Sequence, residues 1–326
     1  MKAVRCVELC DPRGLRIEDV PQPQAAQDEV LIRVHAASVN FPDVLMIAGK
    51  YQVQPPMPFT PGLEVSGTVE ALGPGVDGFQ PGQRVLAQVP MGAFAEFATA
   101  PAIATRAIPY DLNDAEAAAF PLVYQTSYFG LVYRAQLREG EAVLVHSAAG
   151  GVGLAAVQIA KALGAGPIIG TAGSDDKLDA IRAAGADVAI NYQTQDFVEV
   201  VKEHTGGRGA DVIYDPVGGE IAQRSTKCIA FEGRLVIIGF TSGDFTQFRS
   251  NHILIKNYSV VGLHFGYYRQ MNPDKIEQGW QELVDLQGRA GFRPAIAGSY
   301  PLEQVAEAME FLTSRRAIGK VVLTVS

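Results

Sequence analysis

The segment from residue 142 to residue 164, AVLVHSAAGGVGLAAVQIAKALG, places three glycines between two apolar runs. Ala148, Gly150 and Gly153 fit the pattern G-x-G-x-x-G with alanine in the first place. Glycine at 150 lets a pyrophosphate approach the backbone, and glycine at 153 lets the following helix pack closely on the preceding strand. Free N–H groups at the start of that helix favour an anion. The residues expected at the phosphates are Ala149, Gly150, Gly151, Val152 and Gly153.

The alternation of strands and helices from about residue 125 supplies the elements that this loop needs. Short β-branched runs such as AVLVHS, PIIGTAG and ADVIYDPVG each precede a helical stretch, and RLVIIGF and YSVVGLH follow. This alternation is typical of a parallel, doubly wound sheet. A lone glycine pattern also occurs in turns that only allow tight packing, but its place before these units favours a dinucleotide. His146, just before the loop, is expected to be a packed core residue rather than a general base.

The end of the second strand distinguishes the two nicotinamide dinucleotides. An NAD site requires an acid there, about 20 residues beyond the glycines, to accept from the ribose hydroxyl. In this chain PIIGTAG ends at Gly173 and Ser174 follows, with no acid in that place. Lys177 lies in the first helical turn and Tyr192 ends the third strand, so these groups could hold a 2′-phosphate. The pattern favours NADPH.

Two neighbouring acids oppose that assignment. Asp175 and Asp176 would repel a phosphate if they faced it. Both residue types also suit the start of a helix, where their side chains point into solvent. Lys177 taken alone is also consistent with a solvated surface lysine.

The first part of the chain is rich in short strands. EVLIRVHAASVN and GLEVSGTVEALG carry alternating or β-branched apolar residues, and turn clusters such as GPGVDGFQPGQ separate them. These features favour a compact barrel-like module. Beyond about residue 265, two helices (DKIEQGWQELVDLQGR and LEQVAEAMEFLTSR) precede a final strand, KVVLTV. That strand is expected to return to the first module, because a barrel with a missing strand would need one.

Segments along nearly the whole chain resemble one family. They include SVNFPDVLMIAGKY, PGLEVSGTVEALGPGV, SAAGGVGLAAVQIAKALGA, GADVIYDPVGG, GRLVIIGF and IGKVVL. They are similar to the medium-chain dehydrogenase/reductase superfamily and, within it, to the zinc-independent, zeta-crystallin-like quinone oxidoreductases. The resemblance implies an α/β fold, with a GroES-like β-rich barrel domain over residues 1–124 and 266–326. A Rossmann doubly wound parallel sheet would occupy residues 125–265, and the protein would be a homodimer.

Metal ligands distinguish the branches of that superfamily. Zinc alcohol dehydrogenases place a cysteine after the segment that corresponds to AASVN, and a His-Glu pair where this chain has Leu63 and Glu64. Here Phe41, Pro42 and Asp43 follow AASVN, and leucine cannot bind a metal. A catalytic zinc needs three protein ligands, and no recognisable spacing supplies them. We therefore expect no metal. A quinone or an activated alkene is electron-poor, so its reduction needs no Lewis acid.

By the same resemblance, Asn40, Asp43 and Tyr51 would line the acceptor site. Asn40 could donate to an acceptor carbonyl, Tyr51 could stack on a ring or donate a proton, and Asp43 could orient Asn40 or a water. Asn40 and Asp43 also suit the start of a helix at VLMIAG, and Tyr51 also suits packing on PPMP.

Further cofactor contacts follow from the resemblance and from the strand ends. Thr126 would lie near the nicotinamide, although a helix-packing threonine is the alternative. Phe240, Leu263 and Phe265 follow strands whose ends meet the ligand in a doubly wound sheet. Lys320 resembles a family position near the cofactor, and a surface lysine is the alternative.

The leading hypothesis is NADPH-dependent reduction of a quinone by hydride transfer. Reduction of an activated alkene (an enone, enal or enoyl thioester) needs nearly the same residues and is the alternative. An NADPH-binding protein without turnover, crystallin-like or regulatory, is an alternative of another class.

The composition limits the kinds of binding partner that we expect. The 326 residues carry a formal net charge of −8, so bulk electrostatics do not favour nucleic acid or an anionic membrane surface. No apolar run is long enough to span a bilayer, and the N-terminus lacks a secretory apolar region. Cys6 and Cys10 have no second pair to complete a metal site or a disulfide framework. We expect a cytoplasmic protein that takes a small quinone or enone.

Overall fold

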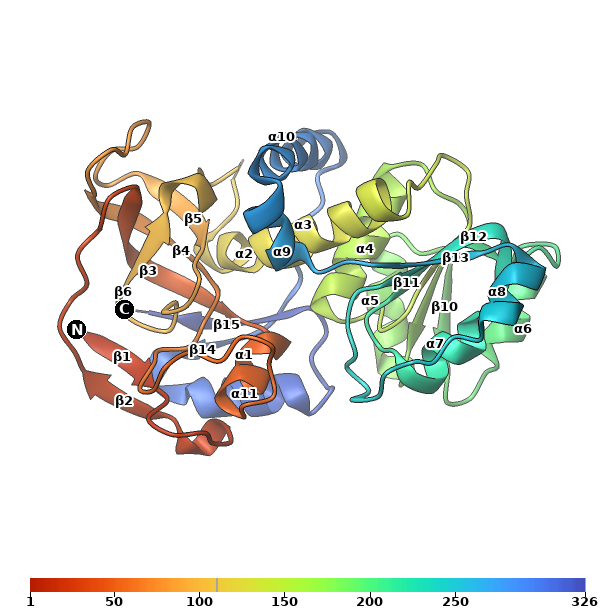
Figure 1. Ribbon diagram of the computed structural model, residues 1–326, viewed down its shortest axis with the longest axis horizontal. Helices are drawn as coiled ribbons and strands as arrows, with labels where there is room; N and C mark the ends of the chain where they lie inside the picture. The colour runs from red at the N-terminus through yellow and green to blue at the C-terminus, as the bar shows by residue number, and fades with distance from the viewer. Residues whose placement is uncertain (110, 326) are drawn as a thin grey trace. The chain divides into compact units, whose positions relative to one another are not determined.

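The computed structural model describes residues 1–109 and 111–325, which divide into two compact units. Unit 1 comprises Met1–Leu122 and Arg293–Ser326, and unit 2 comprises Val123–Phe292. In Figure 1 the red-to-yellow start and the violet-blue end of the chain belong to unit 1, and the green-to-blue segments between them belong to unit 2.

Helix α10 (Pro273–Ala290) belongs to unit 2, whereas the sequence grouped residues 266–326 with the barrel. Glu282 of this helix accepts hydrogen bonds from the hydroxyls of Tyr128 (3.0 Å) and Tyr133 (2.7 Å), which are both in unit 2. The chain therefore returns to unit 1 only after α10, because this amphipathic helix packs on residues of unit 2.

Unit 1 contains a seven-stranded sheet in the order β14-β15-β3-β4-β5-β7, with β6 paired to β3. Its strands are β3 (Glu29–Val39), β4 (Glu64–Leu72), β5 (Arg84–Gln88), β6 (Phe97–Pro101), β7 (Thr105–Ala107), β14 (Ile296–Pro301) and β15 (Lys320–Thr324). A separate hairpin pairs β1 (Lys2–Arg5) with β2 (Arg16–Asp19). This arrangement confirms the β-rich first module.

The helices of unit 1 are short and lie between these strands. They are η1 (Pro12–Gly14), α1 (Phe41–Ile47), η2 (Ala102–Ala104), α2 (Asp114–Ala119), η5 (Leu302–Gln304) and α11 (Val305–Thr313). Helix α3 (Pro121–Tyr128) contains the boundary between the units.

The last strand returns to the first module, as the sequence predicts. β15 pairs antiparallel with β3, and Val321 lies opposite Val39. Lys320 begins β15 and Asn40 directly follows β3, so this register brings the two residues together. The pairing therefore builds part of the candidate site described below.

Unit 2 contains a six-stranded sheet in the order β10-β9-β8-β11-β12-β13, in which every neighbouring pair is parallel. Its strands are β8 (Val143–Val145), β9 (Ile168–Ala172), β10 (Val188–Asn191), β11 (Ala210–Asp215), β12 (Ile229–Ile237) and β13 (Ser259–Gly262). Numbered from β8, this order is 3-2-1-4-5-6, which is the Rossmann order. The predicted doubly wound sheet is confirmed.

Helices connect and cover these strands. They are η3 (Phe129–Arg134), α4 (Gly151–Ala162), η4 (Asp175–Lys177), α5 (Leu178–Ala183), α6 (Phe197–His204), α7 (Gly219–Ser225), α8 (Ser250–Lys256), α9 (Phe265–Met271) and α10.

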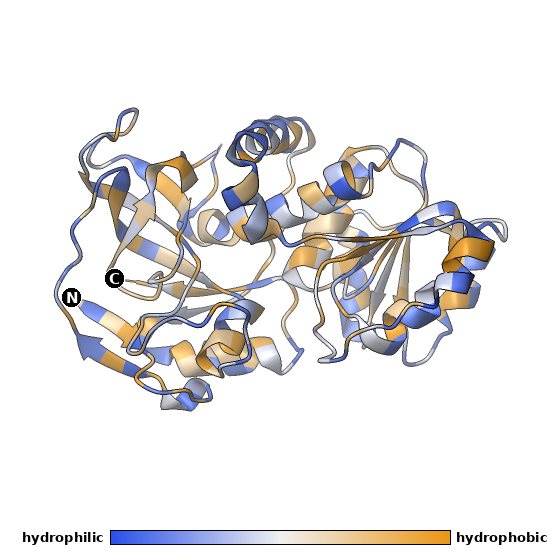
Figure 2. Ribbon diagram, in the orientation of Figure 1, coloured by the Kyte–Doolittle hydropathy of each residue, from blue (hydrophilic) through white to orange (hydrophobic). Residues whose placement is uncertain are grey.

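In unit 2 the strands of the sheet are apolar because helices cover the sheet. Every residue of β8 is buried, as expected for a parallel strand covered on both faces. Figure 2 shows orange along the strands of this sheet, whereas α10 is mostly blue. Within residues 1–109 and 111–325, we find no helix with the length and apolar character needed to cross a membrane.

Candidate functional site

The glycine loop of unit 2 connects β8 to α4. Gly150 is the N-terminal cap of α4, with extended backbone angles (φ −78°, ψ 170°) and no side chain to occupy the helix end. A Cβ at Gly153 would lie 2.2 Å from the carbonyl oxygen of Ser147 and 2.7 Å from Cα of Ala148. Only glycine therefore lets the first turn of α4 contact the loop this closely.

The N-terminus of α4 offers backbone donors at this loop. The N–H of Leu154 bonds to the carbonyl of Gly150 at 2.9 Å. The three N–H groups before it, on Gly151, Val152 and Gly153, have no acceptor within the helix. These donors and the helix dipole favour an anion, so the residues of the loop fit the pyrophosphate of a dinucleotide.

Residues of α3 hold the start of α4 in place. The hydroxyl of Ser127 donates to the carbonyl of Val152 at 3.0 Å, and Tyr124 donates to Gln158 at 2.5 Å. Thr126 is the one residue between 123 and 131 that is not buried. Its side chain is therefore not fully covered by neighbouring residues, so the contact between Thr126 and the cofactor stays a prediction.

The end of β9 is shaped by Gly173 and Tyr192. A Cβ at Gly173 would lie 2.8 Å from the hydroxyl oxygen of Tyr192, so the tyrosine ring lies directly against the glycine. Ser174 follows in extended conformation, and Lys177, which ends η4, is half-buried. The Tyr192 hydroxyl is thus held beside the strand end at which a ribose 2′-phosphate is expected.

Asp175 has a specific partner in this region. Its Oδ1 accepts a hydrogen bond of 2.8 Å from Nδ2 of Asn191, the last residue of β10. Asp175 and Asp176 are both exposed. The Asp175 carboxylate is therefore oriented by Asn191, which the sequence reading did not anticipate.

The residues after β12 and β13 occupy different environments. Phe240 is 36% exposed and packs edge-to-face on Phe245 at a centroid distance of 4.8 Å. Leu263 and Phe265 are buried, and Phe265 packs edge-to-face on Phe129 at 5.1 Å. Phe240 thus lies at the surface of unit 2, and the other two belong to its interior.

His146 belongs to the interior of unit 2. It is 1% exposed, and its ring nitrogens lie 3.0 Å from the hydroxyl of Thr171 and 2.7 Å from that of Ser225. Burial, with a contribution from the charge of Arg224, lowers the pKa of His146 to about 3. It is therefore a neutral packed residue, as the sequence predicts.

Unit 1 holds a buried polar network around Lys320, which we call the Lys320 network (Asn40, Asp43, Glu64 and Lys320). Lys320 Nζ donates to Asn40 Oδ1 and lies 3.1 Å from Glu64 Oε1. Glu64 Oε2 accepts from the N–H of Leu122 at 2.8 Å. Asn40 and Lys320 are each 5% exposed, and Asp43 and Glu64 are completely buried. Lys320 is therefore not a surface lysine.

The Asn40 amide is fully engaged within this network. Nδ2 donates to Glu64 Oε1 at 2.9 Å and to the carbonyl of Ser38 at 3.1 Å, while Oδ1 accepts from Lys320. An ammonium can only donate and a carboxylate can only accept, so these partners fix the orientation of the amide. Donation from Asn40 to an acceptor carbonyl would first require one of these hydrogen bonds to break.

Asp43 caps the start of α1 from inside the unit. Its Oδ2 accepts the backbone N–H of Asn40 at 2.7 Å, and its Oδ1 has no hydrogen-bond partner among the described residues. Burial raises the pKa of Asp43 to about 7, against the opposing effects of the Asn40 N–H and the positive charge of Lys320. This carboxyl group therefore changes its charge near neutral pH.

Tyr51 lies beyond α1, half-buried against the hydrophobic core of unit 1. Its carbonyl accepts a hydrogen bond of 2.7 Å from Nε2 of Gln54. Tyr51 thus packs on the core of unit 1, and its roles in stacking or proton donation stay predictions.

Glu64 is the network residue whose role the sequence reading did not assign. The signal was present, because a glutamate inside the apolar strand GLEVSGTVEALG must find a partner when it is buried. No group of three or more His, Cys, Asp or Glu side chains that could hold a metal gathers in the described part of the chain.

Comparisons with known proteins agree with this arrangement. Residues 26–110 match the family model of the alcohol dehydrogenase GroES-like domain, and residues 151–285 match that of the zinc-binding dehydrogenases. A quinone oxidoreductase-like protein 2 homolog from Nematostella vectensis is 36% identical over 325 residues, with 99% of this chain and 88% of the relative covered. Human quinone oxidoreductase is 32% identical, with 99% and 97% covered.

Solved structures show the same fold. The Escherichia coli quinone oxidoreductase complexed with NADPH superimposes with a TM-score of 0.90 at 31% identity, covering 99% of this chain and 100% of that one. The Thermus thermophilus quinone oxidoreductase, described with its NADPH complex, gives 0.85 at 34% identity, with 99% and 100% covered. Similarity to quinone oxidoreductases over nearly the whole chain shows that the protein is an oxidoreductase. This chain belongs to the medium-chain dehydrogenase/reductase superfamily, in its quinone oxidoreductase branch.

Proposed function

We propose that the protein reduces quinones with NADPH and without a metal. The observation that carries the proposal is the glycine loop, where Gly153 admits α4 so closely that its free N–H groups form an anion cradle. Two similar quinone oxidoreductases were solved with NADPH, which supports this choice of cofactor.

The chain's own residues have distinct tasks in this proposal. The start of α4 binds the pyrophosphate, and Ser174, Lys177 and Tyr192 bind the 2′-phosphate beside Gly173. The contacts proposed for the nicotinamide are Thr126, Phe240, Leu263, Phe265 and Lys320. Asn40 and Tyr51 are the contacts proposed for the acceptor, and the buried Asp43 is proposed to orient Asn40.

The reaction requires a hydride for the acceptor and one proton from solvent or a side chain. Bound NADPH supplies the hydride. The protein orients the reactants and excludes water, and hydrogen bonds or water stabilise the oxyanion that develops on the quinone. Tyr51 is the side chain proposed to donate a proton where the acceptor requires one.

The Lys320 network supports zinc independence. The ammonium of Lys320 already neutralises Glu64 at 3.1 Å, so a divalent cation at this carboxylate would have to displace a buried positive charge. Leu63, beside it, offers no ligand atom. Zinc prefers thiolate and imidazole ligands, and this network offers only carboxylates and an amide.

The function is tested by mixing the protein with NADPH or NADH and one acceptor at a time. The acceptors are a para-quinone, an ortho-quinone, an enone and crotonyl-CoA, each with and without a chelator, and loss of nicotinamide absorbance is the readout. Quinone-dependent oxidation of NADPH that is indifferent to chelator is the expected result. Turnover with the alkenes alone would assign the protein to the reductases of activated alkenes, and binding without any turnover would identify a non-enzymatic NADPH-binding protein.

We also propose a homodimer. β13 ends the sheet of unit 2 and pairs only with β12 among the described strands, so its outer edge is open to a second strand. Leu254, shortly before it in α8, is 76% exposed. Sedimentation that yields twice the chain mass supports the dimer, and a monomer at micromolar concentration contradicts it.

A further inference from the structure

A pocket of about 240 Å³ lies on unit 2, at the amino-terminal ends of β11 and β12. Gly209, which directly precedes β11, and Ile229, which begins β12, both line it. The glycine loop follows the carboxyl end of β8, and all three strands run parallel. The pocket therefore lies at the opposite end of the sheet from the dinucleotide site.

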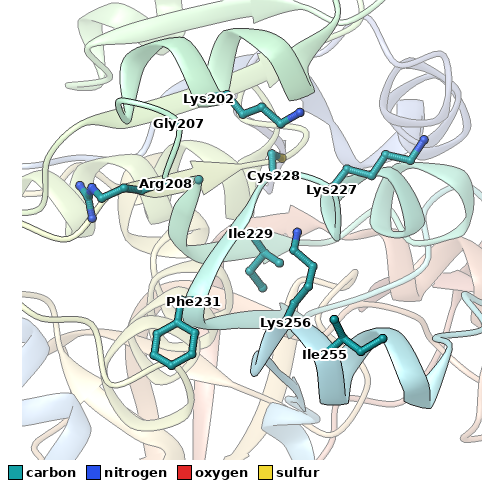
Figure 3. A pocket seen from close by; sticks show the side chains of 10 residues that line it. Lys202, Gly207, Arg208, Lys227, Cys228, Ile229, Phe231, Ile255 and Lys256 are labelled. Atoms are coloured by element: carbon teal, nitrogen blue, oxygen red, sulfur yellow. The ribbon is translucent and has the colours of Figure 1, made fainter.

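Four basic side chains line this pocket, and its described lining includes no acidic residue. They are Lys202, Arg208, Lys227 and Lys256, which we call the basic cluster (Figure 3). The whole chain carries a formal net charge of −8, so the local charge of the pocket lining is opposite in sign to that of the protein as a whole.

The basic cluster is only partly neutralised by the protein. Neither Lys227 nor Lys256 forms an ion pair with a carboxylate of the described residues, and Lys256 Nζ instead donates to the carbonyl of Thr226 at 2.7 Å. Lys202 pairs with Glu199 at 3.0 Å, but that carboxylate is 69% exposed, so water screens the attraction. Arg208 lies 4.0 Å from Asp211, at the outer limit of an ion pair, and its side chain is 64% exposed. A net positive charge therefore remains at the pocket.

Lys202 and Lys256 of the basic cluster both lie near the buried thiol of Cys228. Burial raises the pKa of Cys228 to about 12, and the positive charges of Lys256 and Lys202 oppose this shift. Burial also lowers the pKa of Lys256, and the charge of Lys202 lowers it further. In Figure 3 the ammonium groups of Lys202 and Lys256 lie on either side of Cys228. An anion between them would relieve their repulsion.

Side chains rather than backbone would bind that anion. The glycine-rich loop at the pocket uses its own N–H groups internally, because Gly207 donates to the carbonyl of Lys202 at 2.7 Å and Gly209 donates to Oγ1 of Thr205 at 2.9 Å. The remaining donors are ammonium and guanidinium groups, which bind phosphate oxygens strongly.

The pocket also has an apolar side. Phe231 and Ile255 line it and are 69% and 73% exposed, respectively. A purely inorganic anion would leave these two side chains in water. An ester with an apolar group would cover them and gain from the burial.

We propose that the basic cluster binds the phosphate group of a small phosphorylated molecule, at a site separate from the dinucleotide. The volume of about 240 Å³ is below the roughly 300–1,000 Å³ of pockets that enclose drug-sized ligands, so a phosphate ester fits better than a whole dinucleotide. A phosphate dianion matches several positive charges at once.

Lysine acetylation read by mass spectrometry localises this binding. The protein is acetylated with and without phenyl phosphate, and chloride keeps the ionic strength equal because salt alone screens charges. Acetylation of Lys227 and Lys256 is expected to slow severalfold, while that of Lys161, an exposed lysine elsewhere in unit 2, stays unchanged. Equal protection of all three lysines, or none, would overturn the proposal.

Calorimetry with variants tests the same site independently. The double variant Lys227→Gln and Lys256→Gln should weaken phenyl phosphate binding by roughly tenfold or more, whereas Lys161→Gln, which removes one positive charge outside the pocket, should not. Unchanged affinity of the double variant would contradict the proposal. Inorganic phosphate is the second ligand: weaker binding than phenyl phosphate assigns the pocket to esters, and tighter binding assigns it to free phosphate.

Discussion

Lys320 and Glu64 form a buried ion pair, with 3.1 Å between Nζ and Oε1, although they are 256 residues apart in the chain. Their strands, β15 and β4, are not neighbours, because β3 lies between them in the sheet. Asn40, which directly follows β3, bridges the two side chains. The network thus connects the last strand of the chain to the segment that begins α1.

Replacing Lys320 by methionine should destabilise the protein strongly. Removal of one partner leaves the Glu64 carboxylate buried without compensation, which costs about 3–5 kcal/mol of the free energy of unfolding. Urea unfolding monitored by a probe in unit 1 measures the effect. Lys2→Met is the matched control, because Lys2 pairs with Glu303 at the same 3.1 Å but both side chains are about half exposed (54% and 53%).

A second substitution checks that the cause is the unpaired charge. The double variant Lys320→Met and Glu64→Gln removes both charges but keeps an amide oxygen that can accept the Leu122 N–H, so it should recover part of the lost stability. Equal losses for Lys320→Met and Lys2→Met would show that burial of the pair is unimportant.

The stability of unit 1 should depend on the charge of Asp43. Its pKa rises from 3.8 to about 7 on folding, so between about pH 4 and pH 7 the folded state binds more protons than the unfolded state. The free energy of unfolding should therefore fall as pH rises through this window, by at most about 1.4 kcal/mol per pH unit from this group. Denaturant titrations across the window measure the slope.

The Asp43→Asn variant isolates this contribution. It keeps an oxygen that accepts the Asn40 N–H but cannot ionise, so its stability should fall less steeply over the same pH range. Asp77→Asn, which changes an exposed loop residue, controls for loss of a surface carboxylate. Parallel pH profiles for the wild type and Asp43→Asn would contradict the interpretation.

Gly153→Ala should disrupt the phosphate cradle. The added methyl group would lie 2.2 Å from the Ser147 carbonyl oxygen, so α4 must move away from the loop. We expect NADPH affinity, measured by quenching of protein fluorescence, to fall by about tenfold or more. Gly262→Ala, whose Cβ would meet no atom within 4 Å, should leave it unchanged.

Lys177→Gln should weaken NADPH binding and leave NADH binding unaltered. The lysine is proposed to contact the 2′-phosphate, which NADH lacks, so only NADPH loses a charge-assisted contact. The dissociation constant should rise roughly tenfold for NADPH and stay unchanged for NADH. An equal loss for both would indicate that Lys177 acts through the fold around η4.

The parts of the account that sequence could predict are those encoded locally. The βα units predicted the doubly wound parallel sheet, and KVVLTV predicted the return of the last strand to the first module, because strand patterns can be read in short segments. The strand order and the pairing of β15 with β3 come from the structure. The boundary at which unit 2 ends was harder to predict from the sequence. The place of α10 depends on the contacts of Tyr128 and Tyr133 with Glu282, more than a hundred residues away in the chain.

In the candidate site too, contiguous motifs could be predicted and contacts between distant residues could not. The glycine loop is a contiguous motif and was predicted with its residues, whereas the partners of Lys320 lie 280 and 256 residues away. The family resemblance suggested Asn40 as a donor to the acceptor, and only the packed structure shows that its amide already donates to Glu64 and Ser38. A cytoplasmic location stays a prediction.

The central claim is hydride transfer from NADPH to a quinone. Single-turnover oxidation of NADPH that carries deuterium at the hydride-donating carbon tests it most directly, with a quinone in excess and a chelator present. We expect that oxidation requires the quinone and is slower when one of the two hydrogens on that carbon is deuterium than when the other is. Oxidation at equal rates with either label, or no oxidation in the presence of quinone, would contradict it.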